Sequence, residues 1–192
     1  MPPDGSLPFP AFLHLEGRQA VVVGGGPVAA SKVPALLQAG AAVTVIAPRQ
    51  VPVLDTLPVR QVRRRFLASD LDGAWWVVAA ATPAVNRLVR RAADRRRLFV
   101  NAVDDTSSGS AYLGAVLIRG DVMLAVSTAG QAPALAAVLR DALEALLPAE
   151  VAAWASLARA ERARWKAEGV PMAERRPRLL DALARLAAGG TR

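Results

Sequence analysis

Short apolar runs alternate, along the first half of the chain, with longer segments in which apolar residues recur at helical spacing. The short runs are rich in valine and alanine, which is typical of strands buried on both faces of a parallel sheet, and they lie at residues 18–23, 42–47, 75–81 and 98–103. Residues 59–64 alternate between apolar and polar positions, as a more exposed strand does. Helical spacing occupies residues 28–39 and 83–96. This alternation predicts an α/β fold with a Rossmann-like, doubly wound parallel sheet.

Beyond residue 105 the pattern becomes that of a small α+β region followed by helices. The predicted elements are strands at 112–118 and 122–127 joined by a turn at 119–121, a helix at 133–147, and further helices from 150 with a break at 169–171. The hairpin and its helix cannot bury both of their faces alone, so we expect a homodimer. The predicted domains are a sheet domain at 1–111, a dimerisation hairpin and helix at 112–148, and a helical C-terminal domain at 149–192.

A glycine-rich turn, Gly24-Gly25-Gly26-Pro27-Val28-Ala29, follows the first predicted strand and opens the first predicted helix. Inside a strand–helix–strand unit this spacing predicts a dinucleotide site. Gly24 makes the tight turn, Gly26 lets the backbone approach the pyrophosphate, and the small Ala29 allows close packing of helix on strand. The helix amino terminus offers N–H groups and a partial positive charge to the phosphates. The alternative is a purely structural glycine turn.

The second predicted strand lacks the acidic residue that usually holds the ribose hydroxyls, because it ends in Ala47-Pro48-Arg49. Arg49 could instead meet a ribose phosphate, which would favour NADP over NAD. Both dinucleotides remain open on the residues alone.

Charge and composition exclude several classes of function. The net charge is +8, and a basic surface attracts polyanions. The arginine runs are not interleaved with aromatic residues, so we interpret them as solvated faces and predict no binding of nucleic acid. The chain contains no cysteine, and His14 is its single histidine, so we predict no metal site made by the protein. We find neither a signal peptide nor an apolar run that could cross a membrane, and we expect a cytoplasmic protein.

Several short segments together carry a resemblance to a known family. They are the glycine-rich turn with Ala30-Ser31-Lys32, the preceding residues 7–9 and 15–18, Asn101-Ala102-Val103-Asp104, and residues 125–130 and 172–176. In order and spacing the chain resembles the precorrin-2 dehydrogenase/sirohydrochlorin ferrochelatase family, in its free-standing form. This family is also the amino-terminal half of siroheme synthase.

The resemblance implies NAD-dependent dehydrogenation of precorrin-2 to sirohydrochlorin, with insertion of Fe²⁺ into sirohydrochlorin in some members. The family manages without the acid after the second strand, so NAD is the expected cofactor. Besides the three glycines, the cofactor residues implied are Pro27, Val28, Pro48, Arg49 and Thr82. The tetrapyrrole substrates are rich in carboxylates, which suits a basic protein.

The resemblance makes Asp104 the carboxylate at the reaction centre. Asp104 follows a predicted strand at the carboxyl edge of the sheet, where such folds place their ligands, and it could act as a general base. The alternative is a turn or cap residue, since aspartate favours both. Asp105, its neighbour, is expected to face solvent.

Departures from the family lie at the cofactor edge and in the substrate cleft, and they leave the NAD-binding fold intact. They are a short loop after Thr82, Asp105-Thr106 after Asp104, and alanine at positions 115, 129 and 132. Two alternatives therefore stay open: a non-catalytic NAD-sensing regulatory module, and a dehydrogenase that leaves iron insertion to a separate chelatase.

Overall fold

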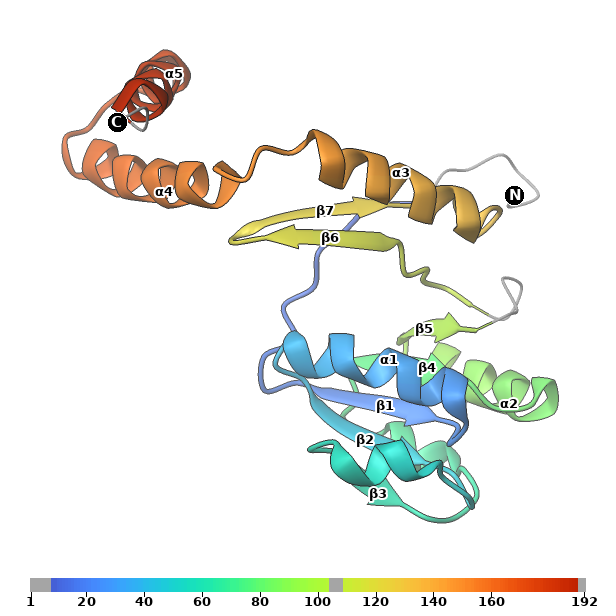
Figure 1. Cartoon of the computed structure of the whole chain (residues 1–192). Helices are drawn as coiled ribbons and strands as arrows, with labels where there is room; N and C mark the ends of the chain where they lie inside the picture. The colour runs from blue at the N-terminus through green and yellow to red at the C-terminus, as the bar shows by residue number, and fades with distance from the viewer. Residues whose placement is uncertain (1–7, 104–108, 190–192) are drawn as a thin grey trace. The chain divides into compact units, whose positions relative to one another are not determined.

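The chain is described by a computed structural model that covers residues 8–103 and 109–189 (Figure 1). It divides into two compact units, Met1–Leu113 and Gly114–Arg192. The first unit contains the whole parallel sheet, and the predicted bounds of the sheet domain, 1–111, stay a prediction. The second unit contains the hairpin and all the helices that follow it, and the further boundary expected near residue 149 stays a prediction.

A five-stranded parallel sheet forms the centre of the first unit. Its order is β3-β2-β1-β4-β5, and its strands are β1 (Gln19–Val23), β2 (Ala42–Ile46), β3 (Arg60–Val62), β4 (Trp76–Ala79) and β5 (Phe99–Ala102). The chain builds outward from β1 to β3 and then crosses to the other side, so the order of the strands reverses between β1 and β4. The prediction of a doubly wound parallel sheet is confirmed, and this reversal is where such sheets bind their ligands.

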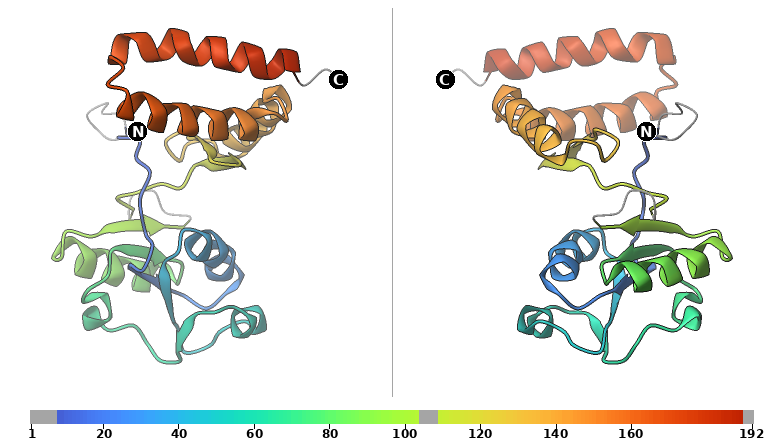
Figure 2. Two further views of the ribbon diagram at one scale, coloured as in Figure 1. Left: turned by 90° about the vertical axis from the view of Figure 1, so that its left-hand side faces the viewer. Right: turned by 90° about the vertical axis from the view of Figure 1, so that its right-hand side faces the viewer.

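Helices cover both faces of this sheet, which explains why the central strands β1 and β4 are almost entirely apolar. Alternate residues of β1 point to opposite faces, so that Ala20 and Val22 pack with helix α1 (Pro27–Gln38), while Val21 and Val23 pack with helix α2 (Pro83–Asp94) (Figure 2). All four side chains are almost completely buried.

Short 3₁₀ helices take the place of full helices around β3. They are η1 (Pro52–Thr56), before the strand, and η2 (Ala68–Leu71), after it. Neither was predicted from the sequence. Pro52 and Pro58 bracket a segment too short for an α-helix, and β3, at the edge of the sheet, is exposed or half-buried along its length as expected.

The two neighbouring tryptophans have different environments, although both lie in the buried strand predicted at 75–81. Trp76 in β4 is buried, but Trp75 is 52% exposed, and the guanidinium of Arg18 stacks 3.9 Å from the centre of its ring. The strand predicted at 75–81 therefore begins one residue later, because Trp75 precedes β4 and lies at the amino edge of the sheet, the edge away from the glycine-rich turn.

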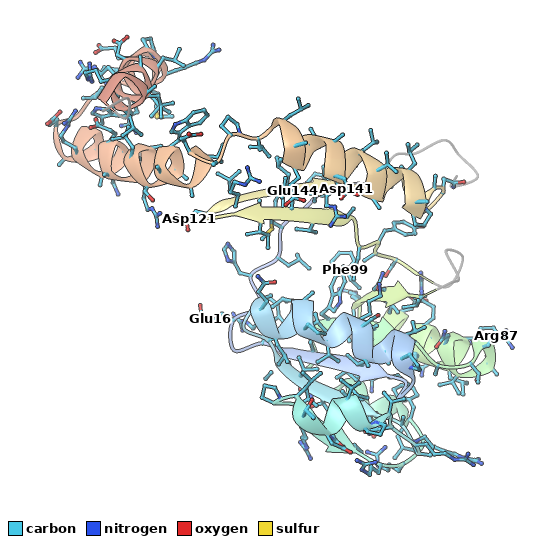
Figure 3. All side chains as sticks on the ribbon, viewed as in Figure 1. Glu16, Arg87, Phe99, Asp121, Asp141 and Glu144 are labelled. Carbon is cyan, nitrogen blue, oxygen red and sulfur yellow. The ribbon has the colours of Figure 1, made fainter. Side chains whose placement is uncertain are left out.

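The second unit consists of an antiparallel hairpin and three helices. Strands β6 (Ala115–Arg119) and β7 (Val122–Val126) are joined by Gly120-Asp121, with Gly120 in the left-handed region at φ 60°. Helix α3 (Pro133–Leu146) packs on the hairpin, and α4 (Val151–Ala167) packs against α5 (Met172–Gly189). Asp121 lies at the turn of the hairpin (Figure 3), and its carboxylate pairs with Arg159 of α4.

The first strand of the hairpin begins later than the pattern predicted, at Ala115 rather than at residue 112. The backbone N–H of Ala111 still donates a 3.0 Å hydrogen bond to the carbonyl of Val100 in β5, so the chain is tied to the first unit up to that point. Among the described helices, none is long and apolar enough to cross a membrane.

Candidate functional site

A cavity of about 630 Å³ opens at the carboxyl edge of the parallel sheet, at the reversal of strand order between β1 and β4. Its wall is made by the residues that end β1, β2 and β4, by the loop after β3 and by the first turns of α2. The volume is within the range of about 300 to 1,000 Å³ that is usual for sites of small molecules and cofactors. This edge of the sheet is therefore the candidate site.

Two of the three glycines in the turn are required by close backbone packing. A Cβ atom on Gly24 would lie 2.2 Å from the carbonyl oxygen of Ala80, and Gly24 has a φ of 135°, which side chains rarely adopt. A Cβ atom on Gly25 would lie 2.1 Å from the carbonyl oxygen of Arg49. These glycines bring the ends of β1, β2 and β4 into direct contact, and the cavity is built on that contact.

Gly26 differs, because a Cβ atom placed there would meet nothing within 4 Å. Its backbone is extended and it forms the N-cap of α1, without a side-chain cap. The N–H groups of Val28 and Ala29 belong to the first helical turn, where no carbonyl within the helix is available to them. Open space beside uncapped amides at a helix amino terminus suits the phosphates of a dinucleotide.

Asn86 fixes the loop after β4, and sequence reasoning did not identify it. Its side chain is buried, and its Oδ1 accepts a 3.0 Å hydrogen bond from the backbone N–H of Ala81, which lines the cavity. A buried asparagine in the first turn of a helix is the signal that could have revealed this role, because a buried side-chain amide needs a partner.

The loop after β3 brings a charge to the cavity. Arg64 donates two hydrogen bonds to Asp70, of 2.8 and 2.5 Å, and Asp70 also accepts one from the backbone N–H of Leu67. The Arg64 guanidinium, by these hydrogen bonds, lowers the pKa of the Asp70 carboxyl below its usual value. This pair holds the loop in which Arg65 and Phe66 line the cavity, and Arg65 is the one charged side chain among the described lining residues.

The structure gathers most, but not all, of the predicted cofactor residues around the cavity. Gly24, Gly25, Gly26, Pro48 and Thr82 line it. The other three cofactor residues do not line it: Pro27 and Val28 are exposed at the start of α1, and Arg49 is exposed just beyond Pro48. Arg49 contributes its backbone, since its carbonyl is the group packed against Gly25.

Asp104, the predicted reaction-centre carboxylate, lies outside the described residues, as does Asp105. The residues around them are anchored to the sheet. The backbone N–H of Val103 donates to the carbonyl of Ala79 at 3.0 Å, and Nδ2 of Asn101 donates to the carbonyl of Ala111 at 3.2 Å. The chain therefore leaves β5 at the carboxyl edge, next to the end of β4.

Within residues 8–103 and 109–189, no three histidine, aspartate or glutamate side chains lie close enough together to hold a metal ion. His14 is exposed. In helix α2, Arg87 is exposed, as the interpretation of the arginine runs as solvated faces predicts, and it points away from the sheet (Figure 3).

Comparison with known proteins agrees with this geometry. The model of a family described as "Putative NAD(P)-binding" matches residues 11–115. Siroheme synthase 3 of Aeromonas hydrophila is 41% identical over 173 residues, which make up 88% of this chain and 37% of that protein. Siroheme synthase of Photobacterium profundum is 42% identical over 161 residues, or 81% of this chain and 34% of that protein. The chain thus spans little more than a third of the length of these relatives.

A solved structure described as "SirC, precorrin-2 dehydrogenase" is similar along almost the whole chain. It superposes with a TM-score of 0.74 at 27% sequence identity, covering 90% of this chain and 88% of SirC. A likeness over 90% of the chain extends beyond the first unit, Met1–Leu113, into the second.

Proposed function

The chain belongs to the family of putative NAD(P)-binding proteins, and we propose that it catalyses the NAD-dependent dehydrogenation of precorrin-2 to sirohydrochlorin in siroheme biosynthesis. The observation that carries the proposal is the likeness to SirC, which extends over 90% of this chain and 88% of SirC. A glycine-rich turn occurs in many dinucleotide-binding proteins, so by itself it supports only the cofactor. The match beyond the sheet domain is what supports this substrate.

The cofactor residues fit the task of binding a dinucleotide. NAD⁺, when bound, supplies the acceptor for a hydride. The chain supplies the amides at the start of α1 for the diphosphate, the open space at Gly26 that lets the diphosphate approach them, and an apolar wall from Pro48 and Phe66. The loop that carries Thr82 after β4 lies at the strand reversal, at the carboxyl edge where the nicotinamide end of the cofactor belongs in such folds.

Asp104 is proposed to take the proton that the reaction releases. Precorrin-2 loses a hydride to NAD⁺ and also loses one proton, so the products are sirohydrochlorin, NADH and H⁺. A carboxylate within reach of the reacting carbon can accept that proton as a general base. Val103, the residue before Asp104, is hydrogen-bonded to Ala79 at the carboxyl edge of the sheet, which supports this role.

A homodimer is part of the proposal, and it is supported by an uncovered apolar face of the hairpin. Val116, Ile118 and Met123 are 44%, 44% and 46% exposed, whereas Leu117 between them is buried. Ile118 faces Met123 across the two strands, so these side chains share one face of the hairpin. We call Val116, Ile118 and Met123 the hairpin face. A two-stranded sheet with one bare apolar face gains stability when a second copy covers it.

The test is oxidation of precorrin-2 by the purified protein with NAD⁺, followed by the absorbance of NADH. We expect turnover by the wild type and a loss of about a hundredfold or more in Asp104→Asn, the usual effect of removing a general base. The variant should bind NAD⁺ as the wild type does. Asp105→Asn, a change of the same size at the next residue, should retain activity.

Two results of this experiment count against the proposal. No NADH from the wild type would overturn it. Full activity in Asp104→Asn would remove Asp104 from the reaction. A protein that binds NAD⁺ with no turnover would be the NAD-sensing module instead.

The same preparation, supplied with sirohydrochlorin and Fe²⁺, tests the iron insertion that the family resemblance implies. We also propose a cytoplasmic location, where cell fractionation should find the protein.

A further inference from the structure

Three consecutive arginines after β3 differ in what they bind. Arg63 donates a 2.5 Å hydrogen bond to Asp55, and Arg64 forms its two hydrogen bonds with Asp70. Arg65 forms no ion pair with any residue in the described part of the chain, yet it is the arginine of the three that lines the cavity. A guanidinium left unneutralised at the wall of a cofactor cavity is placed to receive an anion.

The position of Arg65 corresponds to one end of a bound dinucleotide. In Rossmann-type sheets the ribose next to the adenine lies beyond the end of the second strand, and an acidic residue there holds its hydroxyls. Here the wall beyond β2 is formed by Ala47 and Pro48, with Arg65 and Phe66 from the loop after the neighbouring strand β3. The described lining residues include no aspartate or glutamate.

An arginine in place of the usual acidic residue changes which group on the 2′-carbon of this ribose the site recognises. NAD carries a free 2′-hydroxyl on that ribose, which donates a hydrogen bond to a carboxylate. NADP carries a phosphate there, and a planar guanidinium binds phosphate through paired hydrogen bonds. We propose that Arg65 binds the 2′-phosphate of NADP, so that this enzyme takes NADP⁺ in addition to NAD⁺. The inference rests on the dinucleotide site of the proposed function.

The Arg64–Asp70 pair supports the assignment, because it fixes the backbone next to Arg65. Asp70 is held at once by Arg64 and by the N–H of Leu67, on the two sides of Arg65 and Phe66. Arg65 therefore lies in a loop whose backbone is fixed by hydrogen bonds, so less conformational entropy is lost when it binds a phosphate. Arg49, the other candidate, is exposed beyond Pro48 but does not line the cavity.

Binding of NAD⁺ and NADP⁺ to the whole protein, measured by titration calorimetry, tests the inference without relying on activity. We expect the wild type to bind NADP⁺ at least as tightly as NAD⁺. Arg65→Gln should weaken NADP⁺ binding by about tenfold or more, as loss of a charge-assisted contact does. Its affinity for NAD⁺ should change by less than about threefold. Arg63→Gln, the matched control, should leave both affinities unchanged.

Several outcomes would overturn the assignment. The first is that the wild type binds NADP⁺ much more weakly than NAD⁺. The second is that Arg65→Gln loses equal affinity for both dinucleotides. The third is that Arg49→Gln, but not Arg65→Gln, loses affinity for NADP⁺ selectively.

Assays with precorrin-2 separate this inference from the proposed function. Turnover with NAD⁺ but no binding of NADP⁺ overturns the inference alone. Selective loss of NADP⁺ in Arg65→Gln, without turnover of precorrin-2, overturns the proposed function alone.

Discussion

At the scale of single residues, the glycine-rich turn combines two physical roles that look alike in the sequence. Gly24 and Gly25 leave no space for a side chain, because carbonyl oxygens of Ala80 and Arg49 occupy the positions where their Cβ atoms would lie. Gly26 has open space on that side. The first two glycines are therefore needed for folding, and the third leaves room for a ligand.

Substituting these glycines separately should distinguish folding from binding. Gly24→Ala combines an unfavourable φ with a clash against backbone, so we expect a loss of several kcal/mol in the free energy of unfolding, or failure to fold. Gly26→Ala should cost less than about 1 kcal/mol, since its φ of −86° suits alanine. Its added methyl group should nevertheless weaken NAD⁺ binding about tenfold or more, because it fills the space left for the diphosphate. Thermal unfolding and calorimetric titration measure the two effects. Wild-type affinity in Gly26→Ala would contradict the placement of the cofactor.

At the scale of elements, the conformation of the loop from β3 to η2 depends on the ion pair between Arg64 and Asp70, whose two side chains are exposed to different degrees. The side chain of Asp70 is 9% exposed and that of Arg64 is 46% exposed. Asp70 also accepts the N–H of Leu67 at 2.8 Å, so its carboxylate closes the turn that begins η2. The pair Arg63–Asp55 is half exposed on both sides and spans no such turn, so we expect it to contribute little to stability.

The pKa of Asp70 predicts how this loop responds to acid. Arg64 lowers that pKa in the folded protein, so between the two pKa values the unfolded chain binds more protons. The stability from the pair is thus complete above the unfolded pKa of about 4 and is lost as the pH falls through the folded value. Asp70→Asn should lower the melting temperature by about 2 to 4 °C at neutral pH. The difference from wild type should shrink below pH about 4, whereas Asp55→Asn should match wild type throughout. A difference that stays constant down to low pH would show that the charge of Asp70 is not its cause.

At the scale of the whole molecule, the two units have different requirements for stability. The parallel sheet is covered on both faces by its own helices. The hairpin of the second unit is covered by α3 and α4 on one side and leaves the hairpin face exposed on the other. A second copy is the partner we propose for that face.

Charge introduced on the hairpin face should separate the proposed dimer. Ile118→Lys places an ammonium group where the second copy would have to bury it, which costs several kcal/mol. We expect light scattering after size exclusion to give a dimer for wild type and a monomer for this variant. Val53→Lys, at a similarly exposed apolar residue of η1, should remain dimeric. A wild-type protein that is monomeric at micromolar concentration would overturn the proposed dimer.

The amino-acid sequence by itself determined the order of strands and helices, the reversal of the sheet and the place of the glycine-rich turn. These follow from local patterns, since a continuous apolar run and a glycine before a helix have the same physical meaning in most folds. The tertiary structure decided which glycine packs and which leaves space, that Asn86 holds Ala81, and that Arg65 rather than Arg49 lines the cavity. Those roles depend on contacts between segments far apart in the chain, such as Gly24 against Ala80, and no local pattern of residues encodes which distant segment will be the neighbour.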